Sequence, residues 1–278
     1  MSRLVSIVVP VYNGMPHLPR LVDSLLAQDY PRLEIVFSDG GSTDGSLELL
    51  RSIDDARVRV EVPAEARGAA ANWNAATRMA SGDYIKLVCQ DDLLRPDAIS
   101  VQVADLEQNP SAVMAICQRD IVDANGSILY RRRGCAGLAS GAVPGSDVIR
   151  ACYTSGTNVL GEPVTILFRR DALLAGLPWD DSSPLVLDLR LYAKVAPRGD
   201  IVVRKESLGA FRVSTSSWST RIAADQMRQF HQWQLEFAAA NGAGPLERLR
   251  ATVGLRVQTT LRRGAYQWLR LKGSFHSA

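Results

Sequence analysis

Two adjacent carboxylates at the end of an apolar stretch are the residues of this chain best suited to chemistry. The segment Gly82–Asp92 reads Gly-Asp-Tyr-Ile-Lys-Leu-Val-Cys-Gln-Asp-Asp, and the run Tyr84–Cys89 has the length and composition of a buried parallel strand. Because the carboxyl ends of parallel strands face the ligand crevice of an open α/β sheet, we expect Asp91 and Asp92 to project into a binding site. Magnesium is usually held by one or two carboxylates together with substrate phosphates. The alternative for Asp92 is that it caps the helix that follows.

Polar residues also follow two strand-like runs nearer the amino end. Tyr12 and Asn13 come directly after Leu4–Val11, and Asp39 comes directly after Leu33–Ser38. An aromatic face and a carboxylate at neighbouring strand ends can stack on a pyrimidine base and accept a hydrogen bond from it. The alternatives are that Tyr12 packs in the core and that Asp39 only shapes its turn.

The second half of the chain supplies further charged and aromatic candidates. Asp188 lies near the start of a helix predicted over Leu185–Ala196, where a carboxylate also has a plain stabilising role. Arg212 can bridge two phosphate oxygens with its guanidinium. Trp179 lies in a loop, where an indole can stack on the apolar face of a sugar. The candidates for the acceptor side are Asp92, Glu162, Trp179 and Asp181.

Alternating strand and helix patterns would position these residues. Strands are predicted at Leu4–Val11, Leu33–Ser38, Val58–Val62, Tyr84–Cys89, Val113–Gln118, Val164–Arg169 and Gly199–Arg204. Helices are predicted at Leu18–Gln28, from Ser46, at Gly68–Met79, after Pro96 to Gln108, and at Leu185–Ala196. The order predicts an α/β fold with parallel strands, and the turn at Asp123–Gly126 predicts one hairpin.

Four segments match, in order and spacing, a pattern of the family 2 glycosyltransferases. They are Ser6-Ile-Val-Val-Pro-Val-Tyr12-Asn13, Asp39-x-x-Ser42-Thr43-Asp44, Asn74 eight positions before Gly82, and the segment that ends in Asp91 and Asp92. Over residues 1–100 the chain therefore resembles that family. The resemblance implies a single GT-A domain with a mixed, mostly parallel central sheet, followed here by a C-terminal helical extension.

The resemblance also implies roles for individual residues. Donor or nucleotide binding falls to Pro10, Tyr12, Asn13, Asp39, Asn74, Gln90, Asp91 and Arg212. Asp91, nine positions after Gly82, would hold a divalent cation, Mn²⁺ or Mg²⁺, and Asp188 would be the catalytic base. The chain departs from the family pattern at Cys89, where the family has an Asp, and at Ser214, where it has a His. Both departures weaken the metal prediction.

The implied function is that of an inverting transferase that moves a sugar from a nucleotide-diphosphate donor, with UDP- or dTDP-sugars favoured. The acceptor would be a hydroxyl of a glycan or of a lipid-linked molecule in the synthesis of a bacterial surface polysaccharide. Two alternatives are a catalytically degenerate, transferase-like binding module and a sugar nucleotidyltransferase. The second needs a glycine-rich phosphate loop, and Pro10–Gly14 is not one. Dinucleotide-binding and P-loop motifs do not occur in the sequence.

Length and composition limit the number of domains and the class of protein. The 278 residues, 46% of them hydrophobic, suffice for one large core. We expect a GT-A domain at 1–215, with a nucleotide-sugar-binding half at 1–100 and an acceptor half at 101–215, and a helical extension at 216–278. The sequence has no membrane-spanning run, no signal peptide at its start and no paired cysteine spacing, so it predicts a cytoplasmic protein.

The charge is distributed unevenly. The net charge is +3, but residues 246–272 alone carry seven basic side chains and one acidic one. The remainder is therefore net negative, which argues against a nucleic-acid partner. Apolar residues recur at helical spacing in the same tail, at Leu246, Leu249, Val253, Val257, Leu261, Ala265, Trp268 and Leu269. Two alternatives stay open: a helix docked on the domain with its arginines in water, or peripheral contact with the inner face of the cell membrane.

Overall fold

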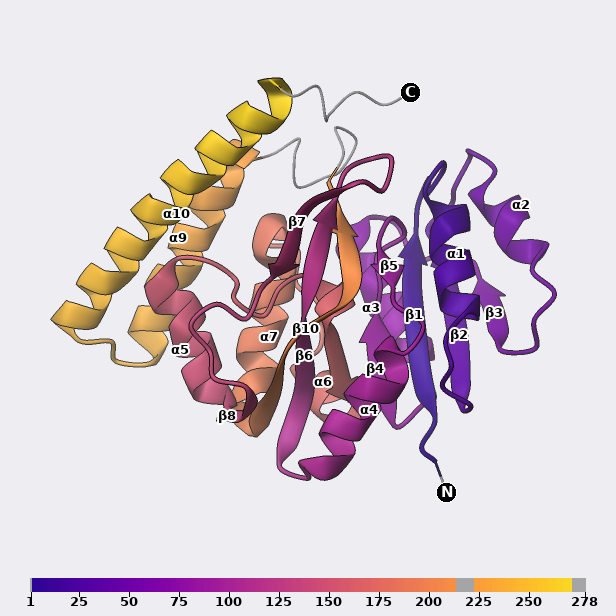
Figure 1. The fold of residues 1–278 in the computed structure, drawn as a ribbon, viewed down its shortest axis with the longest axis horizontal. Helices are drawn as coiled ribbons and strands as arrows, with labels where there is room; N and C mark the ends of the chain where they lie inside the picture. The colour runs from indigo at the N-terminus through magenta and orange to yellow at the C-terminus, as the bar shows by residue number, and fades with distance from the viewer. Residues whose placement is uncertain (1, 214–222, 272–278) are drawn as a thin grey trace.

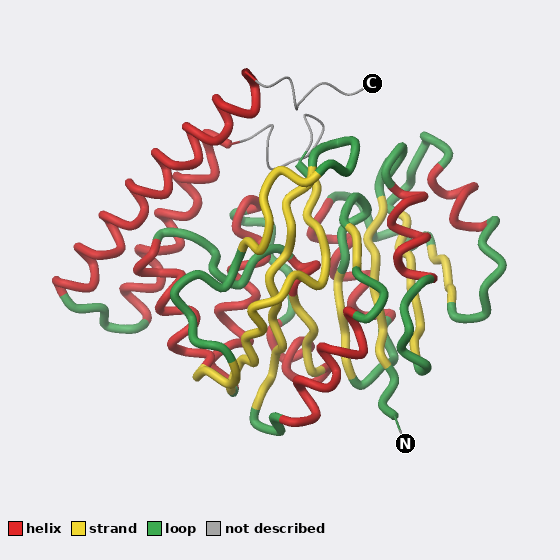
Figure 2. Tube along the Cα trace, in the orientation of Figure 1, coloured by secondary structure: helices red, strands yellow, loops and turns green. Residues whose placement is uncertain are grey.

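A computed structural model describes residues 2–213 and 223–271 of the chain. Its centre is a ten-stranded sheet in the order β3-β2-β1-β4-β9-β6-β10-β5, with β7 added on β6 and β8 on β10. Helices cover both faces of the sheet, and two long helices lie together at the side farthest from β3 (Figures 1 and 2).

The amino-terminal half alternates strands and helices, as the sequence predicts. Its elements are β1 (Val5–Val11), α1 (Leu18–Leu26), β2 (Leu33–Asp39), α2 (Ser46–Arg51), β3 (Val58–Glu61), α3 (Ala69–Met79), β4 (Tyr84–Leu87), β5 (Leu93–Leu94) and α4 (Ala98–Gln108). β1 pairs in parallel with β2 on one side and with β4 on the other. The crossover helices between parallel strands explain why almost all side chains of β1, β2 and β4 are buried.

The second half is more varied. Its strands are β6 (Ala112–Val122), β7 (Ile128–Arg133), β8 (Gly141–Pro144), β9 (Ile166–Arg169) and β10 (Asp200–Arg212). Its helices are α5 (Gly145–Ser155), η1 (Pro163–Thr165), α6 (Arg170–Gly176), η2 (Pro184–Val186), α7 (Leu187–Val195), η3 (Ala196–Arg198), α9 (Ala223–Ala240) and α10 (Pro245–Leu271). The predicted hairpin is the β6–β7 pair, and the predicted last strand extends further, to Arg212.

Two hydrophobic cores lie on opposite faces of the sheet. Val5, Ile7 and Val9 of β1 belong to one core, with α1 and α4, whereas Val8 belongs to the other, with α3, α5 and α7. This division follows from the alternation of side chains along a strand. The strand between the cores is fixed on both sides, so the loops at its carboxyl end start from a rigid support.

Strand direction decides which loops meet. β1, β2 and β4 are parallel, β9 is antiparallel to both β4 and β6, and β10 is parallel to β6. The carboxyl ends of β1, β2, β4, β6 and β10 therefore share one edge of the sheet with the amino end of β9. We call this edge the carboxyl edge; it is the upper edge in Figure 1.

The two C-terminal helices complete the second core. Phe230 and Trp233 of α9 are each 4% exposed, and their rings meet edge to face. The buried Gln234 donates to the carbonyls of Tyr153 in α5 and Ala251 in α10, so it joins three helices. None of the helices in the described part of the chain combines the length and apolar character that crossing a bilayer requires.

Candidate active site

The loops after β1 and β2 are joined by hydrogen bonds between the two segments. The N–H of Asn13 donates to Ser42 Oγ at 2.9 Å, and Asn13 Oδ1 accepts from the N–H of Thr43 at 2.8 Å. Asn13 has φ 49°, a left-handed conformation that asparagine tolerates better than most residues. The N–H of Met15 donates to Asp44 Oδ2 at 2.9 Å. Asn13 therefore fastens the two loops and fixes the backbone beside Tyr12.

Asp39 ends β2 with one carboxylate oxygen occupied and one left over. Its Oδ1 accepts from the N–H groups of Gly41 and Ser42, both at 2.9 Å. Its Oδ2 is buried and has no hydrogen-bond partner among the described residues. A buried carboxylate oxygen is costly to leave unbound. The turn thus uses only Oδ1 of Asp39, and Oδ2 can accept a hydrogen bond from a ligand.

Tyr12 projects outward from the end of β1. Its side chain is 60% exposed, so the alternative that it packs in the core is wrong. The amide of Gln90 accepts from the N–H of Tyr12 at 2.7 Å and donates to its carbonyl at 3.0 Å. Gln90 therefore positions Tyr12 through its backbone. Pro10 is buried within β1, opposite Ser38 of β2.

Asp91 and Asp92 follow β4 as predicted, but they lie in different surroundings. Asp92 is fully buried, and its Oδ1 accepts from the N–H of Arg212 at 3.2 Å. Within the described chain its Oδ2 has no partner. α4 begins at Ala98, with Asp97 before it, so the alternative that Asp92 caps this helix is wrong. Asp91 is half-buried.

Burial affects the charge of both carboxylates. It raises the pKa of Asp91, against a smaller lowering contribution from the charge of Arg212. Burial and the charge of Asp91 together raise the pKa of Asp92 well above its ordinary value. Two neighbouring carboxylates shielded from water resist being ionised together. The pair would therefore gain from a cation.

Asp188 is the second residue of α7 and reaches the same region. Its Oδ1 accepts from the N–H of Leu189 at 2.7 Å, and its Oδ2 accepts from Asn158 Nδ2 at 3.0 Å. Burial, with a smaller contribution from the charge of Glu162, raises the pKa of Asp188 to about 7. Its pKa is therefore displaced to the range in which a carboxylate exchanges protons near neutrality.

Glu162 is held by an arginine. Arg119 of β6 approaches both carboxylate oxygens, with Nη2 at 2.7 Å from Oε1 and Nε at 2.5 Å from Oε2. This pairing orients Glu162, whose charge acts on Asp188. The sequence patterns did not single out Arg119 or Asn158. Asn158 lies three residues before Gly161, and no motif marks it.

Cys89 connects these carboxylates. Burial raises the pKa of its thiol well above the ordinary value, and Asp92, Asp91, Asp188 and Glu162 add to that effect in this order. All four carboxylates are therefore close enough to act on one thiol. We call these four residues the carboxylate cluster. The Cys89 thiol remains protonated at neutral pH and contributes no negative charge to the cluster.

Most of the guanidinium of Arg212 is hydrogen-bonded within the protein, which the sequence does not indicate. Its Nε donates to the carbonyl of Asp91 at 2.9 Å, and its Nη1 donates to the carbonyls of Asp123 and Ala124. Its Nη2 is buried and has no partner among the residues that the structure describes. One nitrogen is thus left for a ligand. The neighbouring Ser214 lies outside the described residues.

Two of the predicted site residues pack in the core instead. The indole of Trp179 is 2% exposed, meets Trp73 edge to face, and donates from Nε1 to Thr77 Oγ1 at 2.9 Å. The prediction that it stacks on a sugar is therefore wrong. Asn74 uses both amide atoms on the backbone of Trp179, which explains its place in the pattern without a donor contact. Asp181 is exposed in the loop after Trp179.

A metal ion would need ligands from outside the protein. Across residues 2–213 and 223–271, no three His, Cys, Asp or Glu side chains gather into a group that could hold one. The residues that are present fit the mode in which one carboxylate binds the ion and substrate phosphates and water complete its shell. Asp91, half-buried and beside Asp92, suits that mode; a site made of protein ligands alone does not fit.

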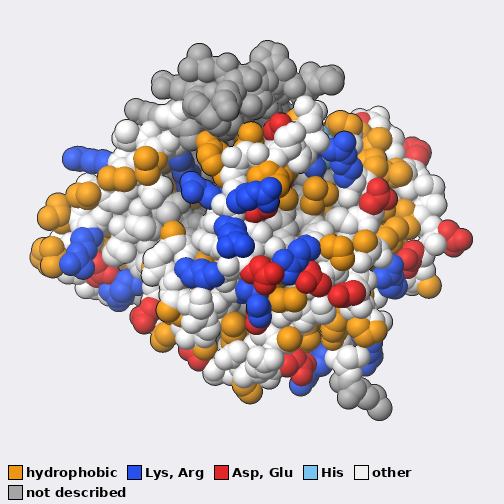
Figure 3. All heavy atoms as spheres, viewed as in Figure 1, with side chains coloured by type: hydrophobic (Ala, Val, Ile, Leu, Met, Phe, Trp, Pro, Cys, Tyr) orange, Lys and Arg blue, Asp and Glu red, His pale blue; other side chains and the backbone are white. Residues whose placement is uncertain are grey.

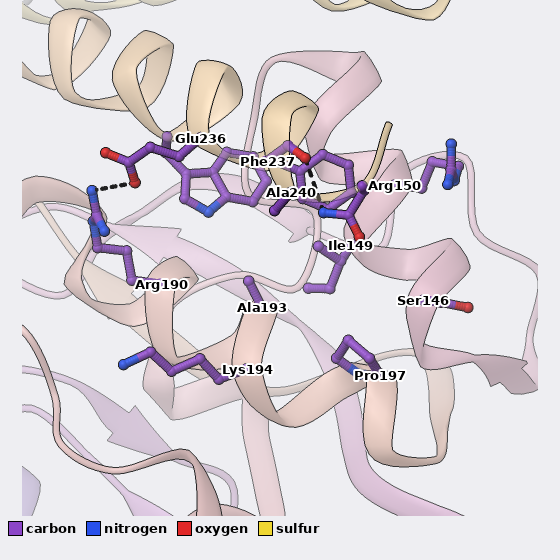
Figure 4. A pocket seen from close by; sticks show the side chains of 12 residues that line it. Ser146, Ile149, Arg150, Arg190, Ala193, Lys194, Pro197, Glu236, Phe237 and Ala240 are labelled. Atoms are coloured by element: carbon purple, nitrogen blue, oxygen red, sulfur yellow. Dashed lines mark hydrogen bonds and ion pairs between the residues drawn. The ribbon is translucent and has the colours of Figure 1, made fainter. Parts of the chain in front are cut away.

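A cavity of about 290 Å³ lies between α5, α7 and α9 (Figure 4). Arg190, Ala193 and Lys194 line it from α7, two to six residues along the helix from Asp188, and α9 supplies the aromatic wall. Residues two apart on a helix point in nearly opposite directions. In Figure 4 Arg190 turns toward Glu236, its ion-pair partner at 2.8 Å. This cavity is separate from the carboxylate cluster.

Comparisons with known proteins agree with the fold and the motif pattern. The protein-family model described as "Glycosyl transferase family 2" matches residues 6–173, more than half of the chain. Glycosyltransferase GlyG of Streptococcus pneumoniae serotype 4 is 35% identical over 116 residues, which are 41% of this chain and 38% of that protein. Chondroitin synthase of Pasteurella multocida is 32% identical over 127 residues, 45% of this chain and 13% of that protein. The matched segment spans less than half of each relative.

Solved structures share the whole fold at low identity. TarS residues 1–349 of S. aureus, solved with UDP, superimposes with a TM-score of 0.63 at 18% identity, covering 91% of this chain and 69% of that one. The mannosyltransferase PcManGT of Pyrobaculum calidifontis, solved with GDP-Man and Mn²⁺, has a TM-score of 0.64 at 20% identity, covering 100% and 77%. The mixed, mostly parallel sheet and the helical C-terminal part are therefore those of a GT-A protein.

Proposed function

Because this chain belongs to glycosyl transferase family 2, we propose that it is an inverting enzyme that transfers a sugar from a nucleotide-diphosphate donor to an acceptor hydroxyl. In such a displacement the acceptor oxygen forms a bond to the anomeric carbon, the bond from that carbon to the diphosphate oxygen breaks, and the hydroxyl proton must leave. The donor and the base therefore belong on opposite sides of the anomeric carbon. The carboxyl edge offers one group of residues for each task.

The donor side is the pair of joined loops after β1 and β2. Tyr12 presents an exposed ring, and Asp39 Oδ2 is a buried acceptor without a partner in the described chain. These features suit a pyrimidine base, which can stack on the ring and donate its N–H to the carboxylate. UDP- and dTDP-sugars are therefore the favoured donors. TarS, which shares the fold, was solved with UDP.

The diphosphate would lie near Asp91 and Arg212. Asp91 would hold a divalent cation, Mn²⁺ or Mg²⁺, jointly with phosphate oxygens, and such an ion neutralises the charge of the leaving diphosphate. The unoccupied Nη2 of Arg212 can donate to the same phosphates. PcManGT, another protein of this fold, was solved with Mn²⁺.

The observation that carries the proposal is Asp188. It is a half-buried carboxylate with a pKa of about 7, fixed by Leu189 and Asn158, and it interacts with the charge of Glu162. An ionised carboxylate of that pKa can take the acceptor proton as the new bond forms. Arg119 already holds Glu162, so Glu162 orients and tunes the site while Asp188 acts as the base.

The acceptor is a hydroxyl of a glycan or of a lipid-linked molecule, in the assembly of a bacterial surface polysaccharide on the cytoplasmic side of the membrane. The support is that curated relatives of the matched segment include chondroitin synthase and hyaluronan synthase. Asp181, in the loop after Trp179, is an acceptor-side candidate whose side chain is exposed.

Calorimetry with UDP, dTDP, GDP and ADP, each with and without Mn²⁺, tests the donor assignment. We expect the pyrimidine nucleotides to bind most tightly and Mn²⁺ to increase their affinity. Tyr12→Ala should weaken binding by about 1 to 3 kcal/mol, the scale of a base stacked on an aromatic ring, whereas Tyr12→Phe should keep it. No heat from any nucleotide at millimolar concentration would contradict the proposal.

A degenerate binding module is the remaining alternative, and Cys89 at the position of a family carboxylate favours it. Slow hydrolysis of a UDP-sugar by the purified protein separates the two, because a binding module releases no nucleotide. The family assignment leaves no support for a sugar nucleotidyltransferase.

A further inference from the structure

α10 exposes a continuous row of large apolar side chains. Leu246, Leu249, Val253, Val257 and Leu261 are each at least 50% exposed. Their spacing of three or four residues places them on one face of the helix, which we call the α10 stripe. These five make up a large share of the big apolar side chains exposed anywhere in residues 2–213 and 223–271. Isolated exposed leucines are ordinary, but a contiguous row marks an interaction surface.

The opposite face of α10 docks on the protein. Ala251 is 3% exposed, and a Cβ added at Gly254 would lie 2.3 Å from the carbonyl oxygen of Thr154. Arg150 of α5 pairs with Glu247 at 2.5 Å. Small residues thus bring α10 close to α5. The helix is docked, as one of the two sequence alternatives states, but it docks by its small residues and leaves the stripe outside.

Positive charge flanks the stripe. Arg248, Arg250 and Arg256 are exposed, and Glu247 is the single acid in the sequence of α10. That acid is already paired with Arg150. In Figure 3 orange and blue side chains lie together along the left edge of the molecule, where Figure 1 places α10. The surface is therefore apolar along its centre and cationic beside it.

We propose that the α10 stripe is a peripheral docking surface for an anionic lipid membrane. A helix of this kind lies in the plane of the interface, with its apolar row at the boundary between headgroups and acyl chains and its arginines at lipid phosphates. A second copy of the chain is a poorer occupant. It would bring a second set of arginines to the same surface without a free acid on α10 to meet them.

The direction of α10 relates this surface to the carboxyl edge. The C-terminal end of the helix reaches the same end of the molecule as the carboxyl ends of β1 and β6 (Figure 1). α10 is therefore oriented with its C-terminal end toward the carboxyl edge of the sheet. That orientation suits an acceptor anchored in lipid, a point that rests on the proposed function, whereas membrane binding itself does not.

Vesicle flotation with the full chain tests the proposal. The probes are vesicles of phosphatidylcholine alone and of phosphatidylcholine with phosphatidylglycerol, at about 0.05 M and about 0.5 M NaCl, because salt screens surface charge over about a Debye length. We expect the protein to float with the anionic vesicles at low salt and to stay in the bottom fraction with neutral ones.

Variants separate the two contributions. The double variant Val253→Glu/Val257→Glu should reduce partitioning more than tenfold, since it removes two apolar contacts and adds charge that anionic lipid repels. Arg256→Gln should reduce it about fivefold. Val62→Glu replaces an equally exposed apolar residue beyond β3, away from α10, and should leave flotation unchanged. Thermal unfolding confirms that the variants fold.

Equal flotation of parent and double variant would overturn the proposal, as would a parent that ignores anionic vesicles. Light scattering without vesicles tests whether a second copy of the chain occupies the α10 stripe. A dimer that the double variant abolishes would show that a second copy, and not a membrane, covers the stripe. Nucleotide binding by calorimetry is independent of these outcomes, so failure here leaves the proposed transfer reaction standing.

Discussion

Asp44 and Asp188 serve the same edge of one sheet, and their pKa values are displaced in opposite directions. Burial alone would raise the pKa of Asp44, but hydrogen bonds from Ser46 and from the N–H of Met15 lower it overall. Asp188 also receives two hydrogen bonds, yet burial and the charge of Glu162 raise its pKa to about 7. Hydrogen bonds thus compensate the charge of Asp44, whereas those that Asp188 receives do not compensate its charge.

The difference indicates a division of labour. A donor site must present a fixed shape, and loops joined by backbone hydrogen bonds provide it without ordering on binding. A reacting site needs groups whose protonation can change near neutral pH, which uncompensated burial provides. Variants in the loops after β1 and β2 should therefore lose donor affinity, whereas variants of Asp188 should lose turnover.

The largest expected effect is on turnover, from Asp188→Asn. Loss of the general base should slow sugar transfer by ~10² to 10⁴ while the affinity for the nucleotide stays at the parental value. Asp171→Asn is the matched control, because Asp171 is likewise the second residue of its helix, α6, and accepts from the next N–H at 2.8 Å. Steady-state kinetics and calorimetry measure both quantities. Near-parental turnover of Asp188→Asn would move the base to another residue.

The pH dependence should follow the same carboxylate. Because Asp188 must be ionised to accept a proton, kcat/KM should rise about tenfold per pH unit up to about pH 7 and level off above it. Its pKa is higher in the folded chain than in the unfolded one, so the folded state binds the extra proton between the two values. Stability relative to Asp188→Asn should therefore fall as pH rises through this window. A flat rate profile from pH 5.5 to 8 would contradict the assignment.

The complementary effect is on donor affinity, from Asp39→Asn. The amide oxygen can still accept from Gly41 and Ser42, so the turn should persist. The amide nitrogen that replaces Oδ2 cannot accept from a base N–H, and losing a hydrogen bond to a charged group costs about 1.5 to 3 kcal/mol. UDP affinity should fall about tenfold or more with an unchanged melting temperature. Parental affinity would show that Asp39 only shapes its loop.

Asp91 and Asp92 should differ in their link to the cation. Asp91→Ala should abolish the increase in donor affinity that Mn²⁺ gives, whereas Asp92→Ala should retain much of it, because Asp92 is buried against the N–H of Arg212. Asp92→Ala should instead lower the melting temperature, since it leaves that N–H unpaired. Titration of UDP at several Mn²⁺ concentrations measures the linkage. Equal losses in both variants would remove the distinction.

The smallest kinetic effect should come from Trp179. Trp179→Phe loses the bond to Thr77 and part of the contact with Trp73, and should lower the free energy of unfolding by about 1 to 3 kcal/mol. It should leave KM for the acceptor unchanged, since the indole is buried. Urea unfolding measures the change in the free energy of unfolding, and acceptor titration measures KM. A raised acceptor KM with unchanged stability would restore Trp179 to the site.

The sequence by itself determined the alternation of strands and helices in the amino-terminal half and the positions of Tyr12, Asp39 and Asp91, but it did not predict β5, β8, α5 or α6. These features depend on local patterns: continuous apolar runs for strands covered on both faces, and turn residues at their carboxyl ends. Once the strands are parallel, their carboxyl ends must meet at one edge, so the donor-side residues could be placed without coordinates. The domain boundaries at residues 100 and 215 stay predictions.

The tertiary structure alone decided what surrounds each candidate. Burial of Trp179, the pairing of Glu162 with Arg119 and the raised pKa of Asp188 all depend on residues distant in sequence. The tail shows the same limit: its apolar row was visible in the sequence, but which face docks was not. A periodic pattern gives the direction of side chains around a helix axis, whereas packing depends on the partner surface, and on α5 that surface accepts the small residues of α10.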